Sequence, residues 1–332
     1  MPIPPKRHFF IALIACIFIT VSVFAISKFY LTRKSEVLGQ KTSIVRLGLG
    51  KLANNIYFYA GIEAGIFAKY GIEFDLKDQP TSLDSINTLI ANQIDLSGAI
   101  SLDNGLNALV SDPKSFQILT VGTEGQGENA LNTALITNSN SNISSLKDLE
   151  NKKIAVQPGP FSITALRYVL NKAGVDISKT EFISITLADQ LPALQAGSID
   201  AAFTFEPYVS LAQQKGFKIL DSGILSKYYP NGSFGAIFIS SKFVKEKPQI
   251  ARNISQALSE SIEYVRQNNV QSHSILPKYL AIDPEIAETV KPLIYQKPEE
   301  INTEEIQKYV DFSVEQKIIK SKIEIANLIY KP

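Results

Sequence analysis

The chain is predicted to be an α/β protein with two similar lobes, and three observations support this prediction. Helix-spaced and strand-like apolar segments alternate along most of its 332 residues. Residues 89–95 (LIANQID) recur in spacing at 194–200 (LQAGSID), with Leu, Ala, Ile and Asp in register. A glycine-rich segment, residues 122–127, separates the two copies. Two such units predict a cleft between hinged lobes, an arrangement suited to enclosing a small molecule.

The first lobe begins with a strand at residues 44–49, followed by a loop at 50–55. Apolar spacing predicts a helix from Tyr59 to Tyr70, which Gly71 ends as a C-terminal cap. Further alternation predicts strands at 72–76, 94–99 and 116–121, with helices at 82–91 and 103–110. Helix and strand in this order predict a mostly parallel sheet with helices on both faces.

The second lobe repeats this alternation after the crossover. Strands are predicted at 131–137, 153–157, 182–185, 199–203 and 217–220, and helices at 160–173, 191–196 and 207–214. A turn at 230–233 leads into a return strand at 234–240, and everything after Phe243 is predicted to be helical apart from breaks near prolines. We therefore assign residues 44–125 and 236–332 to lobe I and residues 126–235 to lobe II. Two crossovers restrict the lobes to hinge bending.

The N-terminal segment, residues 1–30, predicts export from the cytoplasm. Lys6 and Arg7 precede an apolar run from Phe9 to Ser27, long enough to span a bilayer. Three interpretations stay open: a retained signal anchor, a secretion signal cleaved near Ala25, or a lipid anchor on Cys16. Residues 31–43 are predicted to be a polar linker. Each interpretation places the rest of the chain outside the cytoplasm, in the periplasm or at the outer face of the cell membrane.

Composition excludes several classes of function. Apolar residues make up 45% of the chain and charged residues 20%, which is typical of a globular protein. A net charge of +1 with no basic run argues against a nucleic-acid partner. With two His, which stand alone in sequence, and one Cys, the chain cannot build a metal cluster of the His/Cys type. No phosphate-loop glycine pattern is present either, and we expect no metal and no cofactor.

Three stretches resemble a known family. They are residues 59–72 (YAGIEAGIFAKYGI), residues 146–159 (LKDLENKKIAVQPG), and ALQAGSIDAA at 193–202 running into FEPY at 205–208. In order and spacing they are similar to the substrate-binding proteins of ABC importers of the nitrate/sulfonate/taurine type and their thiamine-precursor pyrimidine relatives. The resemblance runs from about Ile44 to Phe243. It implies a type II periplasmic-binding fold and delivery of a ligand to ABC permease subunits in the membrane, without catalysis. We expect a monomer.

Candidate ligand-binding residues follow strand ends, where open α/β sheets bind ligands. The start of the helix near Pro160 offers free N–H groups to an anion, and Asn side chains both donate and accept hydrogen bonds. Glu206 would suit an amine, although it could also cap a helix or latch the lobes together, and Asp103 looks first like a helix cap. The predicted set is Asn54, Asn55, Tyr57, Ser101, Asp103, Gly159, Phe161, Ser162, Thr164, Glu206 and Tyr208.

The ligand and the function class stay open at this point. Helix N-termini favour a sulfonate, nitrate or carboxylate, whereas Glu206 and the aromatic residues expected around the cleft, Phe205 and Phe234 among them, favour a nitrogen heterocycle or amine. Two alternatives to an importer component remain: a pyrimidine-forming enzyme on the same fold, and a ligand-sensing ectodomain. The enzyme would need a reactive His and a metal site, and the sensor would need a separate signalling partner.

Overall fold

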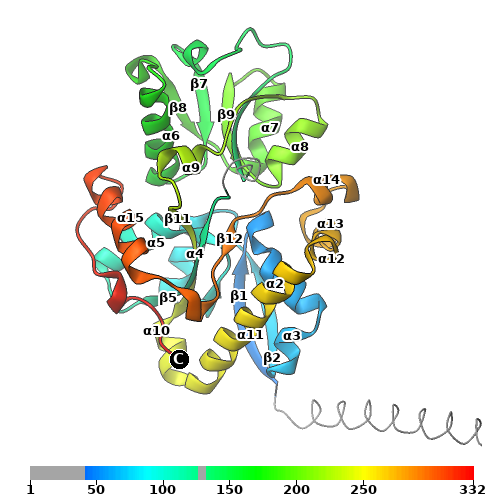
Figure 1. Cartoon of the computed structure of the whole chain (residues 1–332), viewed down its shortest axis with the longest axis vertical. Coiled ribbons are helices and arrows are strands. Elements are labelled where there is room, and N and C mark those ends of the chain that lie inside the picture. Colours follow the sequence, from blue (N-terminus) through cyan, green and yellow to red (C-terminus); the bar gives the residue numbers. More distant parts are fainter. Residues whose placement is uncertain (1–41, 126–131) are drawn as a thin grey trace, which may run out of the picture. The chain divides into compact units, whose positions relative to one another are not determined.

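Two sheets form the framework of the chain. The computed structural model describes residues 42–125 and 132–332, and residues 44–332 pack as one compact unit. The first sheet has the strand order β12-β5-β11-β3-β1-β2, with β4 paired to β11, and the second has the order β10-β6-β9-β7-β8 (Figure 1). The two-lobed α/β fold predicted from the sequence is confirmed.

The strands of the first sheet are β1 (Ser43–Leu49), β2 (Ile72–Asp78), β3 (Leu96–Ser97), β4 (Ile100–Ser101), β5 (Phe116–Thr123), β11 (Ser233–Ser240) and β12 (Ile294–Tyr295). Those of the second sheet are β6 (Thr133–Thr137), β7 (Lys153–Val156), β8 (Glu181–Ser184), β9 (Ala201–Phe205) and β10 (Lys218–Ser222). Every strand predicted between residues 44 and 240 has a counterpart among these, although only Leu96–Ser97 of the predicted 94–99 is strand, and the separate short strand β4 follows at Ile100–Ser101. The division of the chain into lobes at residues 125 and 235 stays a proposal.

The prediction of mostly parallel sheets was wrong in detail, because both sheets are mixed. Strand β3 runs parallel to β1, and β7 runs parallel to both β8 and β9. Strand β11, however, is antiparallel to β3, β4 and β5, and β6 is antiparallel to β9 and β10. Each of these antiparallel pairs includes β5, β6, β10 or β11, the strands on either side of the two crossovers between the sheets.

Both sheets are flanked by helices, one set in the first lobe and another in the second. The first set is α2 (Ile56–Glu63), α3 (Ile66–Lys69), α4 (Ser82–Ile90), α5 (Leu102–Ser111), α10 (Ser241–Glu246), α11 (Pro248–Gln267), α12 (Asn269–Ser274), α13 (Leu276–Leu280), α14 (Pro284–Thr289) and α15 (Thr303–Glu315). The second set is α6 (Pro160–Lys172), α7 (Leu187–Gln195), α8 (Tyr208–Gln214) and α9 (Ile224–Tyr228). Single 3-10 turns lie at Ala53–Asn55 (η1), Leu146–Leu149, Ile177–Lys179, Pro298–Glu300 and Ile325–Asn327.

The internal sequence repeat has the same structural role in both sheets. Asp95 donates its N–H to the Arg46 carbonyl, and its carboxylate accepts the Arg46 N–H at 2.9 Å. Asp200 does the same with Lys153: its N–H donates to the Lys153 carbonyl, and its carboxylate accepts the Lys153 N–H at 2.8 Å. Each Asp therefore fixes the turn after a helix to the main chain of a neighbouring strand, β1 or β7.

Two predicted elements differ from the structure. The helix predicted from Tyr59 to Tyr70 is two helices, because Gly65 adopts a left-handed conformation (φ 69°) between α2 and α3. The region after Phe243 is not wholly helical. Ile294 and Tyr295 form β12, which pairs antiparallel with Thr123 and Gly122 of β5. This strand was missed because the prolines before and after it were interpreted only as breaks between helices.

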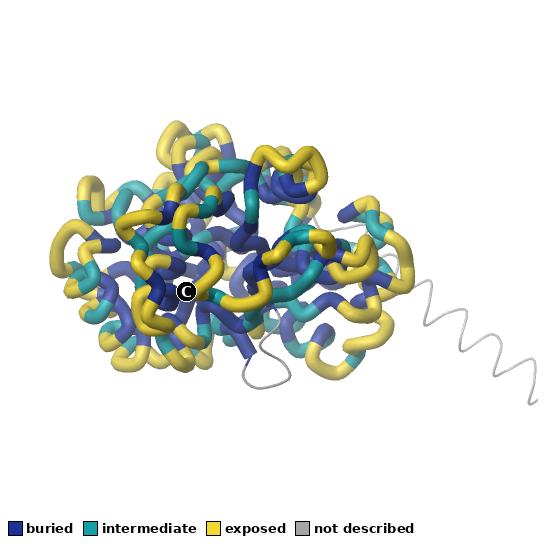
Figure 2. Tube along the Cα trace, turned by 90° about the horizontal axis from the view of Figure 1, so that it is seen from above, coloured by how far each residue is buried: buried dark blue, intermediate teal, exposed yellow. Residues whose placement is uncertain are grey.

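One apolar core extends across both sheets. It joins Phe116 and Val121 of β5 with Ile154 of β7 and Phe161 of α6, all fully or almost fully buried. Helix α15 takes part from the C-terminal region, because the ring of Phe312 lies 5.8 Å from that of Tyr168 in α6. Figure 2 shows the buried residues running through the interior of the trace. The C-terminal helices therefore do more than pack on the first lobe, because α15 also contacts the second.

The predictions about the N-terminal segment, residues 1–30, the lipidation of Cys16 and most of the linker at 31–43 lie outside the described residues. Across residues 42–125 and 132–332, no helix has both the length and the apolar character needed to cross a bilayer.

Candidate functional site

A small cavity lies between the two sheets. Its volume is about 40 Å³, and it takes its walls from both sheets. The first sheet and its loops contribute Leu52, Asn54, Ser82, Ala99, Ile100, Ser101, Asn104, Phe234, Gly235, Leu293 and Tyr295, and the second contributes Gln157, Phe161, Ser162, Phe205 and Leu225. This space can hold a few water-sized groups. We call it the inter-sheet cavity.

Four of the eleven predicted residues line this cavity: Asn54, Ser101, Phe161 and Ser162. The loop that carries Asn54 is fixed by its neighbour Asn55, which donates to the Gly50 carbonyl at 2.8 Å and accepts the Ala99 N–H at 2.7 Å. A methyl group on Gly98 would lie 2.5 Å from the Asn55 carbonyl oxygen, so a glycine is needed for this approach. Asn55 therefore positions the loop and does not line the cavity.

Asn54 connects three parts of the chain. Its carbonyl oxygen accepts hydrogen bonds from the Asn132 side chain and from the Leu293 N–H, each at 2.8 Å. Asn132 also donates to the Lys291 carbonyl at 3.0 Å. The loop before α2, the start of β6 and the segment before β12 are thus held together at one edge of the cavity. The amide oxygen of Asn54 is already used in these contacts.

The start of α5 forms a second wall. Ser101 caps this helix, since its hydroxyl accepts the Asn104 N–H at 3.3 Å, and its own N–H donates to the Ser82 hydroxyl at 3.1 Å. The Asn104 side chain then lies against Gly159, where an added methyl group would come within 2.9 Å of the amide nitrogen. Asn104 is buried, and its carbonyl oxygen has no partner within the part of the chain that the structure describes.

The start of α6 forms the opposite wall. Gly159 precedes the helix with φ at +123°, a conformation that favours glycine, and Pro160 occupies the first turn. Phe161 and Ser162 follow and line the cavity. The main-chain N–H groups of such a first turn have no partner inside the helix, so they are available to an acceptor in the cavity. Thr164, also predicted, lies half-buried in the same helix and does not line the cavity.

Asp103 is fully buried beside the cavity rather than in its wall. It accepts a hydrogen bond of 2.5 Å from the Tyr309 hydroxyl of α15. Burial raises the pKa of this carboxyl to about 6, and the Tyr309 hydrogen bond opposes the shift. The carboxyl is therefore mainly ionised at neutral pH. It places a negative charge one residue before Asn104.

Glu206 joins the end of β9 to the first lobe. Its carboxylate accepts the Ser210 N–H at 3.0 Å, the Ser210 hydroxyl at 2.8 Å and the Lys291 N–H at 3.2 Å. Its carbonyl also accepts the Ala53 N–H at 3.3 Å. The residue is 1% exposed, and burial raises the pKa of the carboxyl to about 7. The contacts with Ser210, in the first turn of α8, are those of a helix cap, and the contact with Lys291 is that of a latch; the side chain does not line the cavity.

A third buried carboxylate lies at the crossover. Glu124 follows β5, and its two oxygens accept four hydrogen bonds: from the Thr133 N–H (2.9 Å) and hydroxyl (2.6 Å), and from the Ser226 N–H (2.8 Å) and hydroxyl (3.0 Å). Burial raises the pKa of this carboxyl as well. Glu124 thus connects the first sheet to both β6 and α9 of the second.

The two predicted tyrosines have other places. The Tyr57 hydroxyl donates to the Leu293 carbonyl at 2.9 Å and accepts the Tyr295 N–H at 3.2 Å, which fixes β12. Tyr208 lines a neighbouring hollow of about 190 Å³ together with Lys51, Asp78, Thr186 and others. Leu52 lines both this hollow and the inter-sheet cavity.

Sequence reasoning missed several lining residues. Phe205 and Phe234 were among the aromatics expected around the cleft, but Tyr295, Gln157 and Ser82 were not singled out. Tyr295 belongs to the strand that was not predicted, so no periodicity indicated it. Gln157 follows directly after β7, and its place at the carboxyl end of a central strand is a signal that could have found it.

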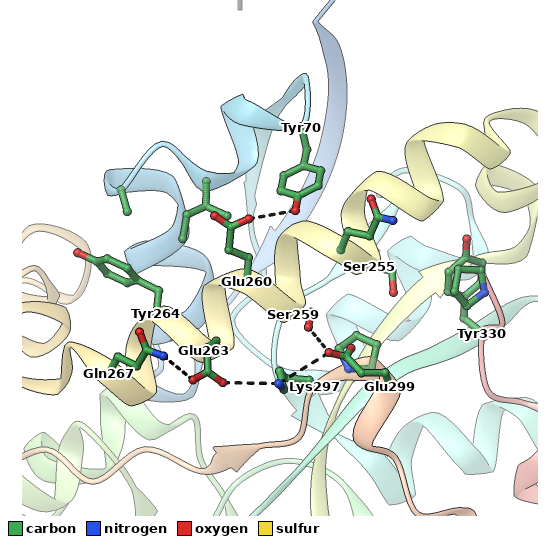
Figure 3. A pocket seen from close by; sticks show the side chains of 15 residues that line it. Tyr70, Ser255, Ser259, Glu260, Glu263, Tyr264, Gln267, Lys297, Glu299 and Tyr330 are labelled. Atoms are coloured by element: carbon green, nitrogen blue, oxygen red, sulfur yellow. Dashed lines mark hydrogen bonds and ion pairs between the residues drawn. The ribbon is translucent and has the colours of Figure 1, made fainter. Parts of the chain in front are cut away.

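A larger hollow lies elsewhere, on α11. Its volume is about 1050 Å³, and Figure 3 shows its side chains. The charged groups there are already paired: Glu260 accepts from the Tyr70 hydroxyl at 3.0 Å, and Glu263 accepts from Gln267 at 2.7 Å and lies 3.5 Å from the Lys297 ammonium. We call it the α11 groove. It takes no residue from the second sheet, so closure of the two sheets cannot enclose a molecule there.

Within the described residues, no group of three or more His, Cys, Asp or Glu side chains is placed to hold a metal ion.

Comparison with protein families supplies the remaining observation. A family model described as NMT1/THI5 like matches residues 53–272. The chain belongs to this family. A protein of Brucella abortus (strain 2308) named as a binding protein is 23% identical over 228 residues, 68% of each chain. A protein of Escherichia coli K12 named as an aliphatic sulfonates-binding protein is 27% identical over 198 residues, which is 58% of this chain and 61% of that relative.

Solved structures of the same fold include both binding proteins and an enzyme. The alkanesulfonate-binding protein SsuA from Xanthomonas axonopodis pv. citri, bound to MOPS, matches with a TM-score of 0.72 at 16% identity, over 88% of this chain and 99% of that one. The desulfurization enzyme DSZB matches with a TM-score of 0.63 at 12% identity, over 86% and 96%. At these identities the likeness shows the fold alone. The predicted family and the periplasmic-binding-protein fold are both confirmed.

Proposed function

We propose that the chain is the solute-binding component of an ABC importer, which captures a small polar or aromatic ligand between its lobes and delivers it to permease subunits in the membrane. The observation that carries this proposal is the inter-sheet cavity, whose walls come from both sheets. A ligand held there contacts both lobes at once and so stabilises the closed form over the open one. Membership of the NMT1/THI5-like family and similarity to proteins named as sulfonate-binding support the same function.

The contacts around the cavity support a closing motion. Glu206 and Asn132 connect the second sheet to the first by hydrogen bonds at the cavity edge, through Lys291 and Asn54. Glu124 connects them at the crossover. Such polar contacts can form and break with little loss of apolar packing, as a hinged protein requires. The ligand adds its own contacts to this set.

We propose that the protein binds its ligand without converting it. The described lining residues offer amide, hydroxyl and apolar groups, which suit binding and orientation rather than general acid–base chemistry. Of the two nearby buried acids, Glu206 accepts hydrogen bonds from Ser210 and Lys291, and one oxygen of Asp103 accepts the Tyr309 hydroxyl. Similarity to the enzyme DSZB concerns the fold, so it favours no particular reaction.

The proposed site of action is outside the cytoplasm. One of the similar solved structures is the periplasmic aliphatic sulphonate binding protein SsuA from Escherichia coli, and the basic and apolar N-terminal sequence of this chain supports the same location. We propose that the N-terminal segment either tethers the protein to the membrane or is removed after export, and that the protein works as a monomer.

A thermal-shift screen tests the proposed function. Sulfonates, nitrate, carboxylates, amines and pyrimidines are added to the exported protein, and a compound at 100 times its dissociation constant should raise the melting temperature by about 4 °C, from about 2.7 kcal/mol of linkage. Ser162→Leu fills the cavity and should abolish the shift. Thr164→Leu, in the same helix but outside the cavity wall, should retain it.

Small-angle scattering of the wild-type protein with the compound found should show a smaller radius of gyration. The proposed function fails if no compound in any class shifts the melting temperature, or if Ser162→Leu responds as strongly as Thr164→Leu.

A further inference from the structure

Two buried polar atoms of the inter-sheet cavity have no partner. Within the described residues, the hydroxyl of Tyr295 and the side-chain carbonyl of Asn104 are buried and accept or donate no hydrogen bond. Tyr295 is completely buried and Asn104 is 7% exposed. Both residues line the cavity. Buried polar groups in folded proteins are nearly always paired, and of the eleven unpaired side-chain atoms among the described residues these two belong to residues that line the same cavity.

The position of the Tyr295 hydroxyl is fixed by its surroundings. The ring lies over Gly122, where an added methyl group would come within 2.5 Å of it, and the hydroxyl lies against Gly235, which also lines the cavity. Tyr57 packs edge-on to the ring, with centroids 5.4 Å apart. No side chain other than glycine fits at these two strand positions without moving the tyrosine. The strands β5 and β11 therefore hold this hydroxyl at the cavity wall.

The Tyr295 hydroxyl is a donor at every physiological pH. Burial raises its pKa well above the ordinary value of 10, since nothing beside it stabilises the ionised form. The Asn104 carbonyl is an acceptor, and its amide group is held near Gly159 at the start of α6. The cavity thus presents one donor and one acceptor from side chains, in addition to the main-chain N–H groups of α6.

The charge around the cavity disfavours an anion. None of the described lining residues is charged: they are amides, hydroxyls, aromatics and aliphatics. The fully buried Asp103 directly precedes Asn104, and at neutral pH it is mainly ionised. The start of α6 lies close by, through the contact of Asn104 with Gly159, and the negative charge of Asp103 offsets the positive potential of that helix end. A second negative charge enclosed in this space would have no cationic side chain to pair with.

Resting on the proposed function, we propose that the inter-sheet cavity selects an uncharged ligand group that accepts a hydrogen bond from Tyr295 and donates one to Asn104, and that it rejects sulfonates and carboxylates. A primary amide, a sulfonamide or a lactam has this pairing of acceptor and donor. The volume of about 40 Å³ suits such a compact group. Any larger remainder of the ligand would extend past Leu52 into the neighbouring hollow, where Lys51 and Asp78 lie.

Matched probes test the proposal. Methanesulfonamide is compared with methanesulfonate, and acetamide with acetate, because the members of each pair have nearly equal volume and differ in charge. Dissociation constants are measured by calorimetry and thermal shift for the wild-type protein and for Tyr295→Phe, Asn104→Leu and Tyr228→Phe. Tyr228 is a buried tyrosine that does not line the cavity, so its variant is the matched control.

The neutral member of each pair should bind at least tenfold more tightly than the anion. Tyr295→Phe should weaken the neutral probe about two- to tenfold, the usual effect of one hydrogen bond, and leave the ligand-free melting temperature unchanged, because the hydroxyl has no protein partner to lose. Asn104→Leu should weaken it by a similar factor, and Tyr228→Phe should not.

Three results would overturn the proposal. In the first, the anions bind more tightly than the neutral probes and Ser162→Leu still abolishes binding. This result would keep the proposed function and reject the proposed ligand class. A Tyr295→Phe protein with unchanged affinity but a lower ligand-free melting temperature would show that the hydroxyl is structural. Binding of neither member of either pair at about 10 mM, while the broader screen finds an amine, would assign the site to a cation instead.

Discussion

Replacement of Glu206 by Gln tests the energetic reasoning about the latch. Burial raises the pKa of this carboxyl from 4.5 to about 7. A carboxyl whose pKa is raised on folding stabilises the folded protein fully below its unfolded pKa and loses that contribution as the pH rises through the folded pKa. At 1.36 kcal/mol per pH unit the whole effect is about 3 kcal/mol, of which about 2.5 kcal/mol falls between pH 5 and pH 8.5.

A glutamine side chain does not titrate, so the Glu206→Gln protein lacks this pH dependence. The two carboxylate oxygens of Glu206 accept three hydrogen bonds from Ser210 and Lys291, and glutamine has only one such oxygen. We therefore expect the variant to be less stable than the wild type at pH 5. Between pH 5 and pH 8.5 the difference should shift in favour of the variant by about 2.5 kcal/mol. For a chain of this size that is about 4 °C in melting temperature.

Thermal unfolding of both proteins at a series of pH values measures the difference in their free energies of unfolding. Other titrating groups such as Asp103 are present in both proteins, so their contributions cancel in this difference. Glu304→Gln removes the same charge at an exposed position of α15 and serves as the control. A difference between wild type and Glu206→Gln that stays within about 0.5 kcal/mol from pH 5 to pH 8.5 would refute the assignment of a raised pKa to this latch.

Three further changes test other parts of the structure. Asp95→Asn removes the ion pair with Arg46 and a hydrogen bond to its main chain, so it should cost about 1–3 kcal/mol in urea unfolding and more than Asp200→Asn, which has only the Lys153 contact. Gly235→Ala should displace the Tyr295 hydroxyl, lowering stability by about 1–3 kcal/mol and weakening any cavity ligand, and an unchanged crystal position of Tyr295 would contradict this. Phe312→Ala removes ring contacts to Tyr168, Tyr228 and Tyr229, each worth about 0.5–1.5 kcal/mol, so scattering of the ligand-free protein should show a larger radius of gyration than the wild type.

Local sequence patterns predicted most of the framework. Strand and helix positions from Ile44 to Ser240 followed from apolar spacing, and the repeated Leu-Ala-Ile-Asp pattern indicated equivalent turns that Asp95 and Asp200 form. Strand direction was harder, because antiparallel pairing of β11 with β5 depends on where the chain returns after about a hundred residues. That is a property of the whole topology, which alternating residues do not encode.

The site was predictable only in part, for a related reason. Asn54, Ser101, Phe161 and Ser162 follow strand ends, a rule that holds for open sheets in general. Tyr295 reaches the same cavity from a two-residue strand, and its contacts with Tyr57, Gly122 and Gly235, all distant in sequence, fix it there. Glu206 was expected to face a ligand or to latch the lobes, and the choice depends on Lys291, which lies 85 residues away.

The ring contacts of Phe312 in α15 with Tyr168 in α6 and Tyr228 in α9 have a consequence for the temperature dependence of opening. Phe312 is half-buried, and its contacts with Tyr168 and Tyr228 shield part of these rings from water while α15 stays against α6 and α9, so separation of the lobes hydrates them further. Apolar association of this kind weakens on cooling. The ligand-free protein should therefore open more readily at low temperature than at higher temperature. Binding of any ligand that closes the lobes should have a negative heat-capacity change, whatever the chemistry of the ligand.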